Sequence, residues 1–305
     1  MAHPLSDVTK DPICCPVCDA DNYTVYCEPK VGVCTSPAVL YGSASGVRGT
    51  QRLVRCRNCT LIYENPRYSE TAIIDAYRQA SGTTHDSQHE MRRQSYKRTL
   101  RSLLGHLPPP PARLLDVGTA GGAFVAAAES LGFTSFGLEP SSDLVRSAVK
   151  KGLVVKEGTL DHNPYVRERF QIITLWDVLE HLCEPKRALR NIHALLDESG
   201  VLVINYPELD TLPGKLLRHR MWWVQSVHIQ HFNRRSIEKI LTACGFRAFH
   251  FQRFYQTLEF AHLIGMAANL GLPFANPIRQ LLPQSLAKLP IRYYAAQTTV
   301  VARKT

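Results

Sequence analysis

From residue 112 to the C-terminus, short apolar runs alternate with helical stretches, and this alternation limits the fold more than any other feature of the chain. ARLLDVG, SFGLEP, FQIITLW and GVLVINYP have the character of strands, whereas DLVRSAVKKG and EPKRALRNIHALL have helical spacing. Such alternation predicts an α/β fold, with a mostly parallel sheet covered by helices. SIEKILTACGF and RAFHFQRF continue the pattern, and AQTTVVARK is the expected last strand.

Two segments interrupt this pattern, near residues 207–232 and 255–294, and we predict that they are insertions over the functional face. The second segment contains a run, Phe260 to Ile278, without Asp, Glu, Lys or Arg. That run is nearly long enough to span a membrane, but its prolines and polar residues argue against stable membrane insertion. We expect this apolar segment to be buried or to contact a partner, for example a second copy of the chain in an oligomer.

The cysteines are concentrated at the N-terminus. The first sixty residues contain Cys14, Cys15, Cys18, Cys27, Cys34, Cys56 and Cys59 out of nine in the chain. The pairs CPVC (Cys15, Cys18) and CRNC (Cys56, Cys59) provide four thiolates on two tight turns, as tetrahedral Zn²⁺ requires. The interval between the pairs exceeds the usual finger spacing, and Cys14 is an alternative ligand. Four cysteine ligands leave no open position, so this zinc is expected to be structural.

The length, the composition and the positions of the cysteines and prolines divide the 305 residues into three predicted parts. A zinc-ribbon domain (1–66) precedes a helical connection that ends at a proline linker (67–111), and the α/β domain follows (112–305). Lys and Arg outnumber Asp and Glu by 36 to 26, which favours an anionic partner, such as a phosphorylated substrate, a nucleic acid or an acidic membrane surface. The N-terminal residues lack the pattern of a secretory signal, so a reducing cytoplasm is the expected compartment.

A glycine-rich turn follows the first strand of the α/β domain, in LLDVGTAGGAF. Glycines let the backbone approach a ligand closely, and the helix that follows offers unpaired N–H donors. Glu139 ends the second strand, about twenty residues later, where a carboxylate can accept both ribose hydroxyls of a nucleoside. Together these features predict a nucleoside-binding site, and a dinucleotide-dependent dehydrogenase shares them.

At these residues the sequence resembles the class I S-adenosylmethionine-dependent methyltransferases, whose domain is Rossmann-like with a seven-stranded sheet. LLDVGTAGGAF is similar to the family's first motif, D-x-G-x-G-x-G, whose positions here are Asp116, Gly118, Ala120 and Gly122. The resemblance implies that Glu139 holds the cofactor's ribose. It also implies that the adenine and methionine ends of the cofactor border Leu160, Asp161, Trp176 and Asp177. DVLEH and ALLDESGVLVINYP favour this family over the dehydrogenases.

The N-terminal half resembles a bacterial branch of that family in the segment CRNCTLIYENPRYSETAIIDAY. In that branch a zinc-bound unit precedes the methyltransferase domain, which often serves sugar, polysaccharide or secondary-metabolite pathways. The resemblance implies methyl transfer from S-adenosylmethionine to a hydroxyl of a small molecule. Carbon methylation of a nucleotide-linked sugar, a zinc-containing RNA methyltransferase and a non-catalytic S-adenosylmethionine sensor are the alternatives. Base-modifying methyltransferases carry an N-P-P-Y type motif at the position that follows FQIIT here. The residues at that position are LWDV, so a nucleic-acid substrate is disfavoured.

Two histidine-containing clusters are candidates for acting on the acceptor. Asp177, Glu180 and His181 form D-x-x-E-H, which either binds a divalent cation or merely places acids at a helix N-terminus. A similar E-x-x-E-H arrangement occurs in quinone-biosynthesis O-methyltransferases. His228 and His231 lie in the first insertion beside Trp222 and Trp223, ahead of a helix that Asn233 could cap. We predict that one of these two histidines is the general base, with His181 in reserve.

Overall fold

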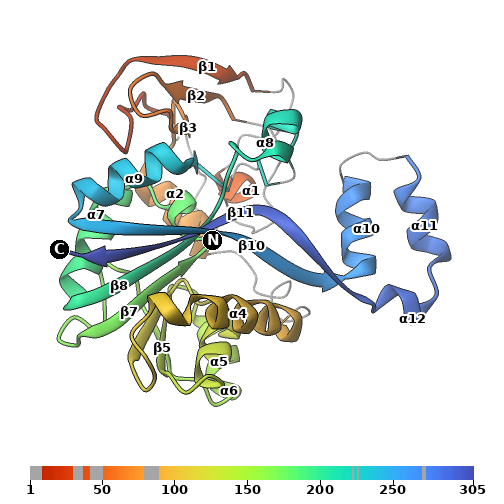
Figure 1. Ribbon diagram of the computed structural model, residues 1–305. Helices are drawn as coiled ribbons and strands as arrows, with labels where there is room; N and C mark the ends of the chain where they lie inside the picture. The colour runs from red at the N-terminus through yellow and green to blue at the C-terminus, as the bar shows by residue number, and fades with distance from the viewer. Residues whose placement is uncertain are drawn as a thin grey trace, which may run out of the picture. The chain divides into compact units, whose positions relative to one another are not determined.

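A computed structural model describes residues 9–29, 37–41, 51–78, 89–221, 223–224, 227–269 and 273–305 (Figure 1). The chain forms two compact units, each assembled from three separate stretches of sequence. The first unit comprises Met1–Ser81, Glu180–Ala188 and Glu208–Ala243, and the second comprises Gly82–Leu179, Leu189–Pro207 and Cys244–Thr305. The predicted division at residues 66 and 111 is linear and does not anticipate this interleaving. Cys34 and Trp222 lie outside the described residues.

The first unit contains a four-stranded antiparallel sheet in the order β1-β2-β3-β9. Its strands are β1 (Tyr23–Cys27), β2 (Leu53–Cys56), β3 (Ile62–Glu64) and β9 (Gln230–His231). Its helices are α1 (Pro37–Tyr41), α2 (Glu70–Arg78), α8 (Leu212–Leu217), η3 (Arg218–Arg220) and α9 (Arg234–Ala243). The segment 207–232, expected to cover the functional face, thus supplies the fourth strand of this sheet. Two of the boundaries between the units fall inside helices, one in η2 (Leu179–His181) and one in α7 (Pro185–Leu195).

The second unit contains the seven-stranded, mostly parallel sheet that the sequence predicts, in the order β10-β11-β8-β7-β4-β5-β6. Among these strands, β11 runs opposite to the other six. The strands are β4 (Arg113–Val117), β5 (Thr134–Glu139), β6 (Val155–Glu157), β7 (Phe170–Trp176), β8 (Leu196–Pro207), β10 (Phe246–Glu259) and β11 (Pro290–Lys304). Six of the seven residues of β7 are buried, as expected for a central strand covered on both faces.

Helices of the second unit pack on this sheet through two apolar clusters. They are α4 (His89–Leu103), which continues into η1 (Leu104–His106), with α5 (Ala123–Glu129) and α6 (Ser142–Lys150). Leu100 and Leu103 of α4 and Phe124 of α5 contribute to one buried cluster with residues of β4, β7, β8, β10 and β11. Burying a side chain of this size stabilises the fold by about 1.5–3 kcal/mol. The core therefore fixes the strand ends of the second unit.

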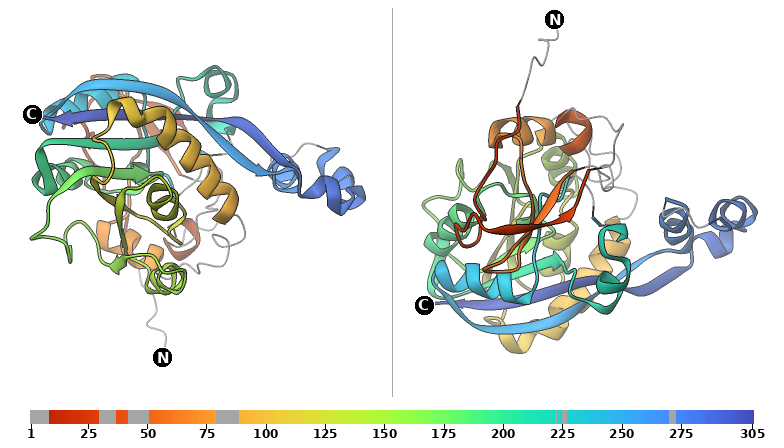
Figure 2. Two further views of the ribbon diagram at one scale, coloured as in Figure 1. Left: turned by 60° about the horizontal axis from the view of Figure 1, so that its bottom comes forward. Right: turned by 90° about the horizontal axis from the view of Figure 1, so that it is seen from above.

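Strands β10 and β11 continue beyond the sheet as a long hairpin whose tip carries α10 (Phe260–Asn269), α11 (Ala275–Leu281) and α12 (Gln284–Ala287) (Figures 1 and 2). The pairing extends to Glu259 opposite Pro290, so the expected insertion 255–294 is partly regular strand. Phe274 and Leu281 are 75% and 82% exposed. The oligomer contact predicted for this segment stays a prediction. Among the described helices, none combines the length and apolar character needed to cross a bilayer.

Candidate functional site

The glycine-rich turn of the second unit connects β4 to α5 through three left-handed residues. Gly118, Ala120 and Gly122 have φ of 71°, 49° and 81°. A side chain on Gly118 would place Cβ 2.6 Å from Cγ2 of Val178, and one on Gly122 would place it 2.4 Å from Cδ1 of Leu153. Glycine is therefore required at both positions for two reasons: the backbone is left-handed, and the neighbouring side chain leaves no room for a Cβ. Ala120 adopts the left-handed conformation as well, and its amide is tied by a hydrogen bond to a neighbouring strand.

That tie is the carboxylate of Glu139, which is fully buried at the end of β5. Its Oε2 accepts a hydrogen bond from the amide of Ala120 at 2.9 Å, and its Oε1 accepts one from the amide of Ser141 at 3.0 Å. Burial raises the pKa of Glu139, and the two amides oppose this rise because they bind the ionised form. Each oxygen keeps a second lone pair for a ligand hydroxyl. Glu139 thus lies where the sequence predicts a ribose-binding acid.

Asp116 lies one strand away, at the end of β4. It is 2% exposed, and its Oδ1 accepts a hydrogen bond from the Thr174 hydroxyl at 2.6 Å. Burial raises the pKa of Asp116 to about 7, against the lowering effect of hydrogen bonds from Thr174 and Thr119. This hydrogen bond therefore ties the end of β4 to β7.

The remaining predicted cofactor residues follow β6 and β7. The side-chain amide of Asn191 donates to the carbonyl of Leu160 at 3.3 Å and to Oδ1 of Asp161 at 3.0 Å, which joins the segment after β6 to α7. Trp176 packs against the ring of Phe124, with centroids 4.9 Å apart, and its indole N–H has no hydrogen-bond partner among the described residues. An unpaired buried donor at a strand end is one that a ligand can satisfy.

Asp177 follows Trp176 in a left-handed conformation, with φ of 56°. Its Oδ1 accepts hydrogen bonds from the side-chain amides of Gln297 at 2.6 Å and Asn205 at 3.2 Å. Burial raises the pKa of Asp177, and the positive charge of Arg92 lowers it. Sequence reasoning missed Arg92, Asn205 and Gln297, because they come from α4, β8 and β11 and share no motif with Asp177.

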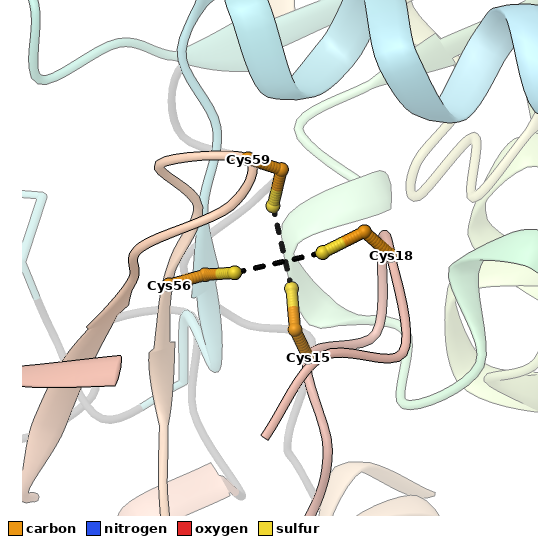
Figure 3. A group of neighbouring side chains, drawn as sticks. All are labelled: Cys15, Cys18, Cys56 and Cys59. Carbon is orange, nitrogen blue, oxygen red and sulfur yellow. Dashed lines mark hydrogen bonds between the residues drawn. The ribbon is translucent and has the colours of Figure 1, made fainter. Parts of the chain in front are cut away.

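In the first unit, the four predicted zinc ligands lie together. Figure 3 shows their sulfur atoms turned toward one another, and all four lie within 4.8 Å. The sulfur of Cys15 is 3.4 Å from that of Cys59, and the sulfur of Cys18 is 3.5 Å from that of Cys56. Zinc–sulfur bonds of about 2.3 Å in a tetrahedron require sulfurs about 3.8 Å apart. Cys14 is exposed and does not belong to the group.

The two cysteine turns have the same backbone form. The amide of Asp19 donates to the carbonyl of Cys15, and the amide of Thr60 donates to that of Cys56. Asp19 and Thr60 then adopt φ of 59° and 68°. A hydrogen bond from the Cys15 thiol and the amide of Leu61 lower the pKa of Cys59 to about 5, against burial, whereas the neighbouring Cys59 and burial raise the pKa of Cys15, and burial raises the pKa of Cys18. The two turns therefore bring together four sulfurs of a kind that binds metal ions.

Glu180, His181 and His228 form a second cluster in the first unit, with ligand atoms within 4.8 Å of one another. Nδ1 of His181 lies 2.8 Å from the carbonyl of Val227, and Nδ1 of His228 lies 2.5 Å from that of Trp223. Since a carbonyl only accepts, both Nδ1 atoms carry a proton. The expected cation trio is thus found with His228 beside Glu180 and His181, whereas amides hold Asp177.

His231 lies on β9, opposite Ile62 of β3. Its ring centroid is 6.2 Å from that of His228, and its side chain is 2% exposed. Neither ring nitrogen has a hydrogen-bond partner among the described residues. Burial and the neighbouring His181 lower the pKa of His231 to about 3, and burial holds the pKa of His228 well below its usual range. Both imidazoles are therefore neutral at physiological pH.

Comparison with known proteins places this geometry in a family. A family model described as "Methyltransferase domain" matches residues 87–250, which is more than half of the chain. Ubiquinone biosynthesis O-methyltransferases of Haemophilus ducreyi and of a Caulobacter species are 29% and 26% identical over 30% and 37% of this chain. These matches span about half the length of the relatives, 44% and 48%.

The fold comparison agrees with the family model. The structure of an S-adenosylmethionine-dependent methyltransferase from Thermotoga maritima superposes with a TM-score of 0.51 at 18% identity, over 73% of this chain and 95% of that one. This likeness concerns the fold alone. With the glycine-rich turn, the buried acid after β5 and the seven-stranded sheet, the chain belongs to the methyltransferase-domain family, as a class I S-adenosylmethionine-dependent methyltransferase.

Proposed function

We propose that this protein methylates a hydroxyl of a small molecule, such as a sugar, a polysaccharide precursor or a secondary metabolite. The observation that carries the proposal is Glu139, whose buried carboxylate is fixed by two amides beside the glycine-rich turn. S-adenosylmethionine supplies a methyl group on a positively charged sulfonium, which leaves as a neutral thioether. We propose that Glu139 accepts the ribose hydroxyls and that Gly118, Ala120 and Gly122 let the backbone approach the nucleoside.

Two observations favour oxygen as the methyl acceptor. LWDV follows FQIIT at the end of β7, where base-modifying N-methyltransferases carry an N-P-P-Y type motif. The two relatives described above are named for O-methylation. A net charge of +10 suits an anionic acceptor, such as a phosphorylated sugar.

The chain's own task is to align the acceptor and to accept its proton. Burial keeps His228 and His231 neutral, so each can accept a hydrogen bond from a hydroxyl, and the same lowering of their pKa values makes each a weaker base than a solvated imidazole. The ring of His228 is the better fixed of the two, because its Nδ1–H donates to the carbonyl of Trp223, which leaves its lone pair on Nε2. We also propose that Cys15, Cys18, Cys56 and Cys59 hold a structural Zn²⁺ that joins the two cysteine turns.

Cofactor binding tests the first half of the proposal. Glu139→Ala removes a charged acceptor worth roughly 1.5–3 kcal/mol, so the affinity for S-adenosylhomocysteine by calorimetry should fall about ten- to a hundredfold. Glu157→Ala is the matched control, because Glu157 lies opposite Glu139 on β6 and is exposed. Equal affinity of the two variants for S-adenosylhomocysteine would show that Glu139 does not bind the cofactor.

Product analysis tests the second half. The protein is incubated with isotopically labelled S-adenosylmethionine and panels of sugars, sugar phosphates, phenols and RNA, and the linkage of the labelled methyl group is read by NMR. A methyl ether supports the proposal. A label on carbon, on nitrogen or on RNA contradicts it.

A further inference from the structure

The tip of the β10–β11 hairpin exposes apolar side chains that its own helices leave uncovered. Helices α11 and α12 pack against α10, and the amide of Phe260 donates to the carbonyl of Leu289 at 2.9 Å, so the tip closes on itself. Large apolar side chains nonetheless remain 45–82% exposed, namely those of Phe274, Ile278, Leu281, Leu286 and Leu289. Single exposed apolar residues are common on protein surfaces, but a group of them in one short segment indicates a surface for a partner.

The charge of this segment has one sign. Glu259 is the last acidic residue of the sequence, so the chain from Phe260 to the C-terminus contains basic but no acidic side chains. At the tip, the exposed Lys288 directly precedes the exposed Leu289. A partner that covers these side chains must therefore accept apolar groups and positive charge together. An apolar surface that is bordered by anionic groups meets both requirements.

Tyrosine and arginine side chains lie on the two strands that lead to the tip. Tyr255 of β10 is paired with Tyr294 of β11, and their ring centroids are 5.8 Å apart. The guanidinium carbon of Arg292 lies 4.8 Å from the ring centroid of Tyr255, and that of Arg253 lies 5.6 Å from the ring centroid of Tyr294. Amphipathic rings and long basic side chains are favoured where a protein passes from lipid into water. The apolar tip is thus followed by an aromatic and basic belt.

The dimensions of the tip suit the surface of a bilayer. Helix α10 has ten residues and is about 15 Å long, which is half of the roughly 30 Å thickness of a hydrocarbon core. The strand from Tyr255 to Glu259, where the pairing ends, adds about 13 Å at about 3.3 Å per residue. An interfacial helix enters the boundary between headgroups and acyl chains by about 5–10 Å. At that depth the exposed apolar side chains are covered and the belt lies on the headgroup side.

A second copy of the chain is a less suitable partner for this surface. Two identical tips that meet face to face bring together segments with positive charge and no carboxylate, so they repel one another. Exposed polar side chains also lie among the apolar ones, namely those of Asn276, Gln280, Gln284 and Ser285. A close-packed protein interface would have to remove these groups from water, whereas the headgroup region keeps them hydrated.

We propose that the tip formed by α10, α11 and α12 inserts into the surface of an anionic lipid bilayer. Phe274, Ile278 and Leu281 enter the boundary between headgroups and acyl chains, and Lys288 and Arg292 contact the lipid phosphates. The contact is peripheral and reversible. It does not depend on which acceptor receives the methyl group.

The test is co-sedimentation of the full chain with vesicles of phosphatidylcholine and phosphatidylglycerol in a two-to-one ratio, compared with vesicles of phosphatidylcholine alone. We expect tighter binding to the anionic vesicles, and high salt should reduce that difference because it screens the lipid charge. Lys288→Gln should weaken binding to the anionic vesicles about fivefold.

Two substitutions that leave the charge of the chain unchanged separate the tip from the rest of the surface. Leu281→Ser removes an exposed apolar side chain of the tip, so the affinity for anionic vesicles should fall about tenfold or more. Val166→Ser is the matched control, because Val166 is 66% exposed in the turn between β6 and β7 of the same unit. This control variant should bind the vesicles as the wild type does. Equal losses in the two variants would overturn the assignment to the tip.

Replacement of residues 260–289 by Asn-Gly provides a second kind of variant, because Glu259 and Pro290 are already paired and such a turn joins paired strands. A cooperative thermal transition reports that each variant is folded. Vesicle binding by this variant at the wild-type affinity would overturn the proposal, since the net charge of the remaining chain would then explain the binding. So would a wild-type chain that binds no vesicles, or one that dimerises through the tip in sedimentation velocity without binding them. None of these measurements uses methyl transfer, so a failure here is distinct from a failure of the proposed function.

Discussion

Gly122 and Gly152 form a natural pair for measuring how tightly the glycine-rich turn is packed. Both have φ of 81°, so alanine at either position pays about 1–2 kcal/mol for the left-handed conformation. A Cβ on Gly152 meets nothing within 4 Å, whereas one on Gly122 lies 2.4 Å from Cδ1 of Leu153 and 3.3 Å from Cβ of Ala148. Carbon atoms at optimal contact are about 3.5–4.0 Å apart. Gly122→Ala must therefore displace Leu153.

Leu153 has little room to move, because it is 8% exposed and packs with Val125, Ala148 and Val155. Overpacking of this kind typically costs about 1–3 kcal/mol. Gly122→Ala should thus destabilise the protein by about 2–5 kcal/mol and Gly152→Ala by about 1–2 kcal/mol. For a unit of this size each kcal/mol lowers the melting temperature by about 2–4 °C.

The assay is thermal and urea unfolding of both variants, with calorimetric titration of S-adenosylhomocysteine. Gly122→Ala should melt lower than Gly152→Ala and bind the ligand more weakly, whereas Gly152→Ala should bind it as the wild type does. Equal melting temperatures for the two variants would refute the packing argument. Equal affinities of the two variants for S-adenosylhomocysteine would show that the turn does not contribute to cofactor binding.

Three further predictions concern charge, metal and capping. Asp116 has a pKa of about 7 in the folded protein and about 3.9 in the unfolded chain. Between pH 4 and 7 the folded state therefore keeps a proton that the unfolded state releases, so the wild type loses stability as the pH rises over this range. Asp116→Asn does not titrate, and its stability relative to the wild type should grow by up to about 1.4 kcal/mol per pH unit over that window; a pH-independent difference in urea unfolding would contradict this. Cys56→Ser should abolish stoichiometric zinc by elemental analysis, and full retention would exclude Cys56 as a ligand. Asn233→Ala removes the acceptor for the amide of Ser236 at 2.9 Å and a donor to Thr60 at 2.9 Å. The free energy of unfolding in urea should fall by about 1–3 kcal/mol, and an unchanged value would show that this cap does not stabilise the helix.

The sequence predicts those parts of the structure that local periodicity decides. FQIITLW is apolar throughout and becomes the buried β7, and Asn233 caps α9 as expected. The cysteine pairs also meet as predicted, because each CxxC turn is formed by its own backbone.

Features that depend on long-range pairing could not be predicted in the same way. β9 has two residues, too few for any period, and only its pairing with β3 makes it a strand. For the same reason the motif D-x-x-E-H suggested Asp177 as a partner of Glu180 and His181, whereas the structure brings His228 to them. Sequence spacing places residues along one element, but it does not tell which distant loop completes a cluster.

The interleaving of the first unit sets an order of events during synthesis. The cysteine turns leave the ribosome early, yet Thr60 bonds to Asn233, which is 173 residues later in the chain. At about 5–20 residues per second this delay lasts roughly 9–35 s. Throughout that interval the nascent thiols lack β9 and α9, and most of the second unit is translated meanwhile. The cysteine turns therefore reach their final packing only after most of the second unit has been translated.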